Sequence, residues 1–262
     1  NTGPGIVAEL GPGDSIGIGL AALLSGSEKY YALDVVGHAS LERNLKTFTD
    51  LVSLFKNRVN IPGQDEFPQV KPYLDTYEFP GQILNGKKLQ NALNTDRVQR
   101  IQDSITNPDR VDSMVQYRVP WHSRDGIQRH SVDMIYSQAV LEHVDDLQEA
   151  YRAMGLWLKP NGFISHQIDY RSHGTAAEWN GHWTHSDLMW RLIRGGRPYL
   201  LNREPHSAHI RTLQDEGFRV VCERKVCSNS NISRNNLAQR FRDISDDDLC
   251  ISGAFIQSVR QN

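Results

Sequence analysis

The sequence lacks the features that are typical of membrane, secreted and nucleic-acid-binding proteins. No apolar run approaches the roughly 18 residues of a transmembrane helix, and no segment combines the basic start and apolar centre of a signal peptide. The formal net charge is -2 at pH 7, so no overall basic field attracts the phosphates of a nucleic acid. We therefore expect a cytoplasmic protein that acts without a membrane or a nucleic acid as partner.

Cysteine is also scarce. The sequence contains 3 cysteines, Cys222, Cys227 and Cys250, an odd number without a C-x-x-C pair. A disulfide framework or a zinc site would need a more regular spacing. We expect ordinary core or surface thiols and no metal centre built on them.

The composition indicates one well-packed α/β domain. With 39% hydrophobic residues, the 262-residue chain can bury one substantial core. Apolar strand-like runs alternate with amphipathic helical patterns, which predicts a largely parallel sheet with helices on both faces. We expect a single domain over residues 1–262, with insertions near 57–110 and 171–206 that cover the active site.

The expected elements follow from hydrophobic periodicity and capping residues. A helix is predicted over 89–105, and Asp145 with Gln148 has the side chains of a capping box for a helix ending near Leu158. Residues 159–162 have the composition of a turn. Further strands are predicted over 30–34, 115–119, 132–137, 163–168, 218–222 and 251–259, and further helices over 16–24, 41–56 and 208–216.

The segment 6–17 predicts a strand, a tight turn and a helix start, which is the local structure of a nucleotide-cofactor site. Glycine at positions 11 and 13 lets a ligand approach the backbone closely. Asp34 ends the next strand, where an acid accepts hydrogen bonds from ribose hydroxyls. A nicotinamide-binding turn is the alternative, which would make the protein an NAD(P)-dependent oxidoreductase. However, Ile16 stands where its third glycine belongs.

Three blocks resemble the motifs of class I S-adenosylmethionine (SAM)-dependent methyltransferases, in the order of that family. Glu9-Leu10-Gly11-Pro12-Gly13 resembles motif I. The block 131–144, which ends in Leu141-Glu142-His143-Val144, resembles the strand 4 motif of the small-molecule branch. The block 158–164 is similar to the turn into strand 5.

The resemblance implies a three-layer αβα, Rossmann-like fold. Its seven-stranded sheet would have the order 3-2-1-4-5-7-6 with strand 7 antiparallel, and SAM would be the cofactor. Gly11 and Gly13 would pass under its methionine and ribose, Glu9 would organise hydrogen bonds near its ammonium group, and Asp34 would hold its ribose hydroxyls. The remaining cofactor contacts would be Ser137 and Gln138 at the methyl donor and Val119 or Trp121 at the adenine.

Transfer to a hydroxyl oxygen also needs a base near neutral pH. His143 follows the fourth strand, and Asp169 and His173 follow the fifth, so these three are the candidate catalytic residues. A metal site formed by Asp169, His173, His182 and His185 is the less favoured alternative, and no metal is expected. We predict methyl transfer to a small molecule or glycan. A methyltransferase-like module that binds without catalysis is a further alternative.

Overall fold

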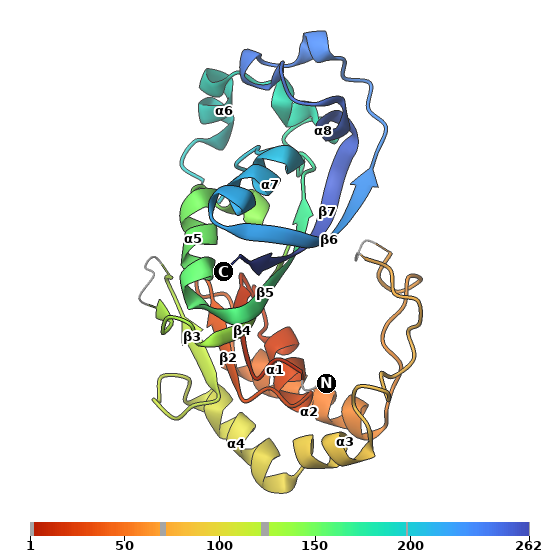
Figure 1. The fold of residues 1–262 in the computed structure, drawn as a ribbon, viewed down its shortest axis with the longest axis vertical. Helices are drawn as coiled ribbons and strands as arrows, with labels where there is room; N and C mark the ends of the chain where they lie inside the picture. Colours follow the sequence, from red (N-terminus) through yellow and green to blue (C-terminus); the bar gives the residue numbers. More distant parts are fainter. Residues whose placement is uncertain (1–2, 69–71, 122–125, 198, 262) are drawn as a thin grey trace. The chain divides into compact units, whose positions relative to one another are not determined.

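The computed structural model describes residues 3–68, 72–121, 126–197 and 199–261. The chain divides into two compact units, and Figure 1 shows the course of the chain through both. Unit 1 comprises Asn1–Ser137 and Leu156–Phe163, and unit 2 comprises Gln138–Gly155 and Ile164–Asn262. The single domain with two insertions stays a prediction.

Unit 1 contains parallel strands whose carboxyl ends meet at one edge. β1 pairs with β2 on one side and β4 on the other, so that Leu10 lies opposite Leu33 and Ser137. β2 in turn pairs with β3. The loops that follow these strands therefore begin side by side. The strands are β1 (Ile6–Leu10), β2 (Lys29–Leu33), β3 (Val115–Arg118) and β4 (Val132–Gln138).

The helices of unit 1 pack on this sheet and on one another. α1 contacts α2 and β2, and α4 contacts α2 and β3. A close approach between α1 and the sheet depends on Gly19, because a Cβ at this position would lie 2.1 Å from the ring of the buried Tyr30. The helices are α1 (Gly17–Leu24), α2 (Leu41–Lys56), α3 (Gly86–Ala92) and α4 (Thr95–Thr106).

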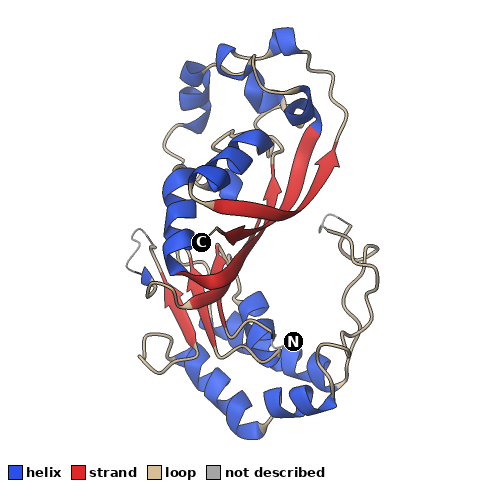
Figure 2. Cartoon of the chain, viewed as in Figure 1, coloured by secondary structure: helices blue, strands red, loops and turns tan. Residues whose placement is uncertain are grey.

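Unit 2 is built on two long antiparallel strands, β6 and β7, visible as adjacent red arrows in Figure 2. β5 belongs to unit 2 from Ile164 onward. The strands are β5 (Leu158–Asp169), β6 (Phe218–Cys227) and β7 (Ile251–Arg260). The α-helices are α5 (Leu147–Trp157), α6 (Asp187–Arg194), α7 (His206–Asp215) and α8 (Asp246–Cys250), with short 3-10 helices η2 (Leu141–His143), η3 (Gly181–Thr184), η4 (Arg234–Asn236) and η5 (Gln239–Phe241).

The segment after β5 packs against the segment between β6 and β7. Trp183, Leu237 and Phe241 form a fully buried cluster in unit 2. The indole N–H of Trp183 donates to the Arg203 carbonyl at 3.0 Å, so its polar edge is satisfied as well. The aromatic residues of the predicted insertion near 171–206 thus include core residues of this unit.

The strand order confirms the predicted fold. The seven strands are arranged β3-β2-β1-β4-β5-β7-β6, and β7 is antiparallel to β6. Helices flank this mixed sheet (Figure 2). This is the order that the three sequence blocks imply, with the switch between β1 and β4 beside the glycine turn.

Three local predictions were wrong. The helix expected over 89–105 is two helices, because the side chain of Asn94 accepts a hydrogen bond from the Asp96 N–H and starts α4. The residues 159–162 continue β5 instead of turning. α5 is capped by Asp146, which accepts from the Glu149 N–H, and the expected capping box of Asp145 with Gln148 does not form.

Candidate active site

The glycine turn after β1 presents open backbone. Gly11 and Gly13 both have positive φ, 63° and 69°, in the left-handed region that favours glycine. The Gly11 N–H donates to the Leu33 carbonyl at 2.8 Å, which ties the turn to the end of β2. A Cβ built on Gly13 would meet no atom within 4 Å among the described residues. The turn therefore leaves room for a ligand directly against its backbone.

Asp34 lies beside this turn, as its position after β2 predicts. Its carboxylate accepts hydrogen bonds from the N–H groups of Gly13, at 3.3 Å, and Val35, at 2.7 Å. Its carbonyl accepts from the Trp121 N–H at 3.0 Å. The side chain is 5% exposed. Gly13, Asp34 and Trp121 thus form one contiguous group at the strand ends of unit 1.

Glu9 is held inside the sheet by two tyrosines. The hydroxyl groups of Tyr30 and Tyr136 donate to its Oε2 at 2.5 and 3.3 Å. Burial raises the pKa of Glu9 to about 7, and the two tyrosine hydrogen bonds offset only part of that effect. Near neutral pH this carboxyl group therefore exchanges between its neutral and charged forms.

The candidate adenine contacts follow β3. Val119 is 37% exposed, while Trp121 is half-buried. The Trp121 ring packs edge-on against the buried Trp157 with 5.9 Å between ring centroids. One face of the strand-end group is therefore lined by apolar side chains. The roles of both residues stay predictions.

The two residues predicted at the methyl donor differ in environment. Ser137 is buried at the end of β4, opposite Leu10. Gln138 is exposed and is the first residue of unit 2. Their contact with a cofactor stays a prediction.

In unit 2, the end of β5 carries an acid paired with two basic side chains. Arg171 donates to Asp169 through Nε at 2.8 Å and Nη2 at 2.6 Å, and His173 Nε2 lies 3.3 Å from Asp169 Oδ2. Burial alone would raise the pKa of Asp169. The hydrogen bonds from His173 and Arg171 outweigh burial and hold it well below its usual range. Asp169 is therefore charged near neutral pH and positions both partners.

His143 lies against His173, with 5.2 Å between the ring centroids. Burial, followed by the neighbouring His173, lowers the pKa of His143. Its Nδ1 atom has no hydrogen-bond partner in the part of the chain that the structure describes. The structure thus brings the three predicted catalytic residues together in unit 2, where the buried Nδ1 of His143 is left unpartnered by the described residues.

Sequence reasoning missed two residues of this group. Glu142 is 2% exposed beside His143, and Asn202 holds the turn on which both lie. The side chain of Asn202 donates to the carbonyls of Leu141 and Val144, each at 2.8 Å. Glu142 could have been found from its position next to His143. Asn202 is distant in sequence and belongs to no motif, so the sequence offered no signal for it.

Arg171 and Arg203 of unit 2 are each paired with a carboxylate. Arg171 binds Asp169, as described above. Arg203 is 3% exposed, donates to the carboxylate of Asp187 at 2.6 Å, and lies over the ring of Trp190. Both side chains are held by protein groups.

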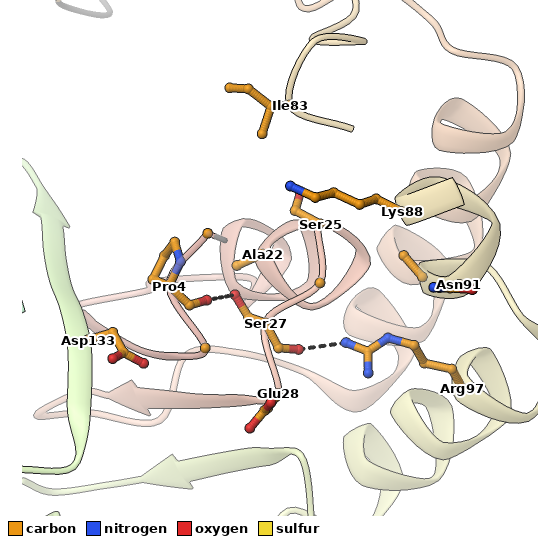
Figure 3. A pocket seen from close by; sticks show the side chains of 14 residues that line it. Pro4, Ala22, Ser25, Ser27, Glu28, Ile83, Lys88, Asn91, Arg97 and Asp133 are labelled. Atoms are coloured by element: carbon orange, nitrogen blue, oxygen red, sulfur yellow. Dashed lines mark hydrogen bonds between the residues drawn. The ribbon is translucent and has the colours of Figure 1, made fainter. Parts of the chain in front are cut away.

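Unit 1 contains two further cavities. One, of about 720 Å³, lies at the start of β1, where Lys88 and Arg97 approach from α3 and α4 (Figure 3). Ser27 Oγ donates to the Pro4 carbonyl at 2.8 Å, and Arg97 Nη2 donates to the Ser27 carbonyl at 2.6 Å. This is the amino end of the strand, whereas ligands of open α/β sheets bind at the carboxyl ends.

The second cavity, of about 840 Å³, is lined by residues of α1 and α2 and by residues 59–62, Glu66, 79–80 and Leu84. Its lining includes the apolar side chains of Ile18, Leu54 and Phe55, and it begins at Ser15. Residues 59–62, Glu66, 79–80 and Leu84 belong to the insertion near 57–110, whose position over the active site stays a prediction.

Residues 94–165 match the family model described as a methyltransferase domain. The matched range contains β3, β4 and part of β5, and the strand order agrees with the three motif blocks. This match and the strand order support a class I SAM-dependent methyltransferase.

The methyltransferase is similar to several solved structures. A SAM-dependent methyltransferase from Mesorhizobium loti is 13% identical with a TM-score of 0.49, and the alignment covers 99% of this chain and 92% of that one. A second from Methanosarcina mazei is 10% identical with a TM-score of 0.49, at 98% and 92% coverage. Geranyl diphosphate C-methyltransferase from Streptomyces coelicolor is 10% identical with a TM-score of 0.47, at 100% and 74% coverage. No curated protein matches the sequence.

The methyltransferase uses SAM as its cofactor. The strand-end group of unit 1 fits this cofactor, because the glycine turn borders open space and Asp34 offers carboxylate oxygens beside it. The prediction of an enzyme is confirmed, and the two alternatives, an NAD(P)-dependent oxidoreductase and a binding-only module, are set aside.

Two further observations concern metals and membranes. Among the described residues, Asp169, His173, His182 and His185 do not form a cluster that could hold a metal ion. Within the same part of the chain, no helix of the methyltransferase has the length and hydropathy to cross a bilayer.

Proposed function

We propose that SAM binds at the strand ends of unit 1 through the residues that the motifs indicate. Gly11 and Gly13 would lie against its methionine and ribose, and Asp34 would hold the ribose hydroxyls. Three observations support these contacts: the positive φ of both glycines, the open space at Gly13, and the carboxylate beside the turn. The other proposed contacts are Glu9 near the ammonium group, Val119 and Trp121 at the adenine, and Ser137 and Gln138 near the methyl donor.

The proposed acceptor is a small molecule or glycan, methylated at a hydroxyl oxygen in the cytoplasm. When bound, SAM supplies an electrophilic methyl group, so the protein must mainly align the acceptor and remove its proton. The observation that carries the proposal is His143, a neutral imidazole whose Nδ1 lacks a partner among the described residues, beside the Asp169–His173 pair.

Each of the three catalytic candidates has a distinct role in this proposal. His143 accepts the hydroxyl proton, because its lowered pKa keeps the imidazole neutral near pH 7. His173 lies next to it, and the negative charge of Asp169 stabilises the positive charge that develops on His143. Asp169 is too weak a base to take the proton itself, because its pKa lies far below its usual range.

Isothermal titration calorimetry tests the cofactor site. Asp34→Ala should weaken SAM binding by about tenfold to a hundredfold, the effect of losing hydrogen bonds to a charged group. Gly11→Arg should abolish binding, because a long side chain would fill the space beside the turn. The matched control is Asp50→Ala on α2, an exposed acid paired with Lys46. Wild-type affinity in both site variants would refute the proposed cofactor contacts.

Transfer from methyl-labelled SAM into metabolite and glycan extracts tests the reaction. His143→Ala and His173→Ala should lower the transfer rate by about a hundredfold, the usual contribution of a general base, with SAM affinity unchanged. The control is His130→Ala, an exposed histidine before β4. With a ¹³C-labelled methyl group, the NMR shift of the product identifies the acceptor atom. A product methylated on nitrogen or carbon would overturn the hydroxyl assignment.

A further inference from the structure

Unit 2 contains a buried acid that the proposed proton transfer does not use. Glu142 lies in η2 and is 2% exposed. Neither oxygen of its carboxyl group has a hydrogen-bond partner among the described residues. A charged carboxylate at this depth without a paired donor is strongly unfavourable. The environment therefore favours the neutral acid.

Hydrogen bonds hold the backbone around Glu142 in place. The Asn202 N–H donates to the Glu142 carbonyl at 2.8 Å, and the Asn202 side chain binds the carbonyls on both sides of η2. Within η2, the His143 N–H also donates to the Val140 carbonyl at 2.9 Å. The position of the carboxyl group is thus set by the segment that precedes α7.

The charged and titratable groups that face Glu142 come mainly from the end of β5. They are Asp169, Tyr170 and Arg171, and His143 follows on η2 itself. Burial is the main effect that raises the pKa of Glu142 to about 8, and Asp169 adds to it. Nearby backbone amides and Arg171 offset only part of the increase. Near pH 7 the pair consists of a neutral Glu142 and a charged Asp169.

We propose that Glu142 is a positioning residue that keeps a neutral carboxyl group behind Asp169, so that Asp169 alone holds Arg171 and His173. The inference rests on the proposed roles of His143, Asp169 and His173. If Glu142 loses its proton, a second carboxylate appears beside Asp169 and competes for Arg171. The Asp169–His173 pair then loses its fixed geometry, and proton removal by the neighbouring His143 becomes slower.

Two measurements on the full chain without acceptor test the protonation state. In infrared spectra of a chain carrying Glu9→Gln, which removes the other buried acid that titrates near pH 7, the C=O band of a buried protonated carboxyl group should persist at pH 7, disappear above about pH 8 and be missing once Glu142→Gln is added. In NMR spectra of protein labelled at histidine Cε1, the His143 and His173 signals should show an extra inflection near pH 8. That inflection should vanish in Glu142→Gln and remain in the control Glu178→Gln, whose acid binds Asn231.

Methyl transfer into the extracts tests the consequence for catalysis. Glu142 releases its proton near pH 8, and the proposal makes that proton essential. The methyl-transfer rate of the wild type should therefore fall about tenfold between pH 7 and pH 9. Glu142→Gln keeps a neutral group of the same shape. It should stay within about twofold of the wild type at pH 7 and remain flat to pH 9. Glu142→Ala, which removes the group, should lower the maximal rate without changing SAM affinity.

The outcomes separate this inference from the proposed function. An infrared band that is already lost at pH 6, or identical titrations of wild type and Glu142→Gln, would overturn the role of Glu142. These spectra need no acceptor, so they stand even if the extracts contain no substrate. Labelled products methylated at nitrogen or carbon would refute the hydroxyl proposal while leaving the spectra to decide on Glu142. If Glu142→Gln fails to fold, the infrared titration of Glu9→Gln alone decides.

Discussion

The Glu9→Gln variant provides a quantitative test of the site in unit 1. Glu9 is 5% exposed, with both tyrosine hydroxyl groups donating to one carboxyl oxygen. Glutamine has the same shape and keeps an oxygen that can accept from Tyr30. The substitution therefore removes the titration of the group while leaving its packing and its main hydrogen bond in place.

The magnitude follows from the pKa of Glu9, which burial raises from 4.5 to about 7 in the folded chain. Below pH 4.5 the acid is protonated in both the folded and unfolded states. As the pH rises toward 7, the unfolded chain ionises first, so the wild type loses folding stability. At about 1.4 kcal/mol per pKa unit, the loss amounts to about 3 kcal/mol and is complete above pH 7. The glutamine variant does not lose this stability.

Urea unfolding at several pH values between 4 and 8 measures the effect. The free energy of unfolding of Glu9→Gln minus that of the wild type should increase by about 3 kcal/mol from pH 4 to pH 8, with its midpoint between pH 5 and 7. Glu42→Gln is the matched control, because Glu42 is exposed in the first turn of α2. A difference that stays constant across this range would show that Glu9 titrates normally and would refute the burial argument.

Three further outcomes follow from single contacts. Gly19→Ala should lower the free energy of unfolding, measured by urea denaturation, by about 1–3 kcal/mol or more. The reason is that its Cβ would lie 2.1 Å from the Tyr30 ring. Gly13→Ala places its Cβ in open space at a φ of 69°. It should therefore lower the free energy of unfolding by only about 1–2 kcal/mol. Asn202→Ala removes two side-chain hydrogen bonds and should destabilise η2 by about 1–3 kcal/mol. The measurement is amide exchange at His143, which should become faster. Unchanged exchange would contradict the role of Asn202 in holding η2.

The sequence predicted the fold well, because three motif blocks resemble those of a family with this strand order. The glycine turn, the acid after β2 and the apolar strands each depend on a few neighbouring residues, and the structure places Gly13 and Asp34 in contact. The errors lie where two local signals compete. Asn94 starts a new helix inside an apparently continuous helical pattern, and Lys159-Pro160-Asn161-Gly162, a turn by composition, continues β5 with Asn161 at a φ of 70°.

The acceptor site shows why residue spacing could not identify its groups. Two pairs of histidines have the same spacing, His182 with His185 and His206 with His209. The members of these pairs nevertheless differ in how deeply they are buried. His182 and His209 are almost fully buried, and burial lowers the pKa of each to about 3.

Such histidines stay neutral throughout the physiological range and cannot exchange a proton with an acceptor. His206 is also buried, but Tyr170 and Glu223 hold its two ring nitrogens. His143, by contrast, is only half-buried, and its neighbour His173 has a side chain that is 28% exposed and contacts a charged acid. Catalytic assignment among these histidines therefore depends on tertiary burial. Motif position pointed to His143 because it follows the fourth strand, and ligands of open α/β sheets bind beyond the carboxyl ends of the strands.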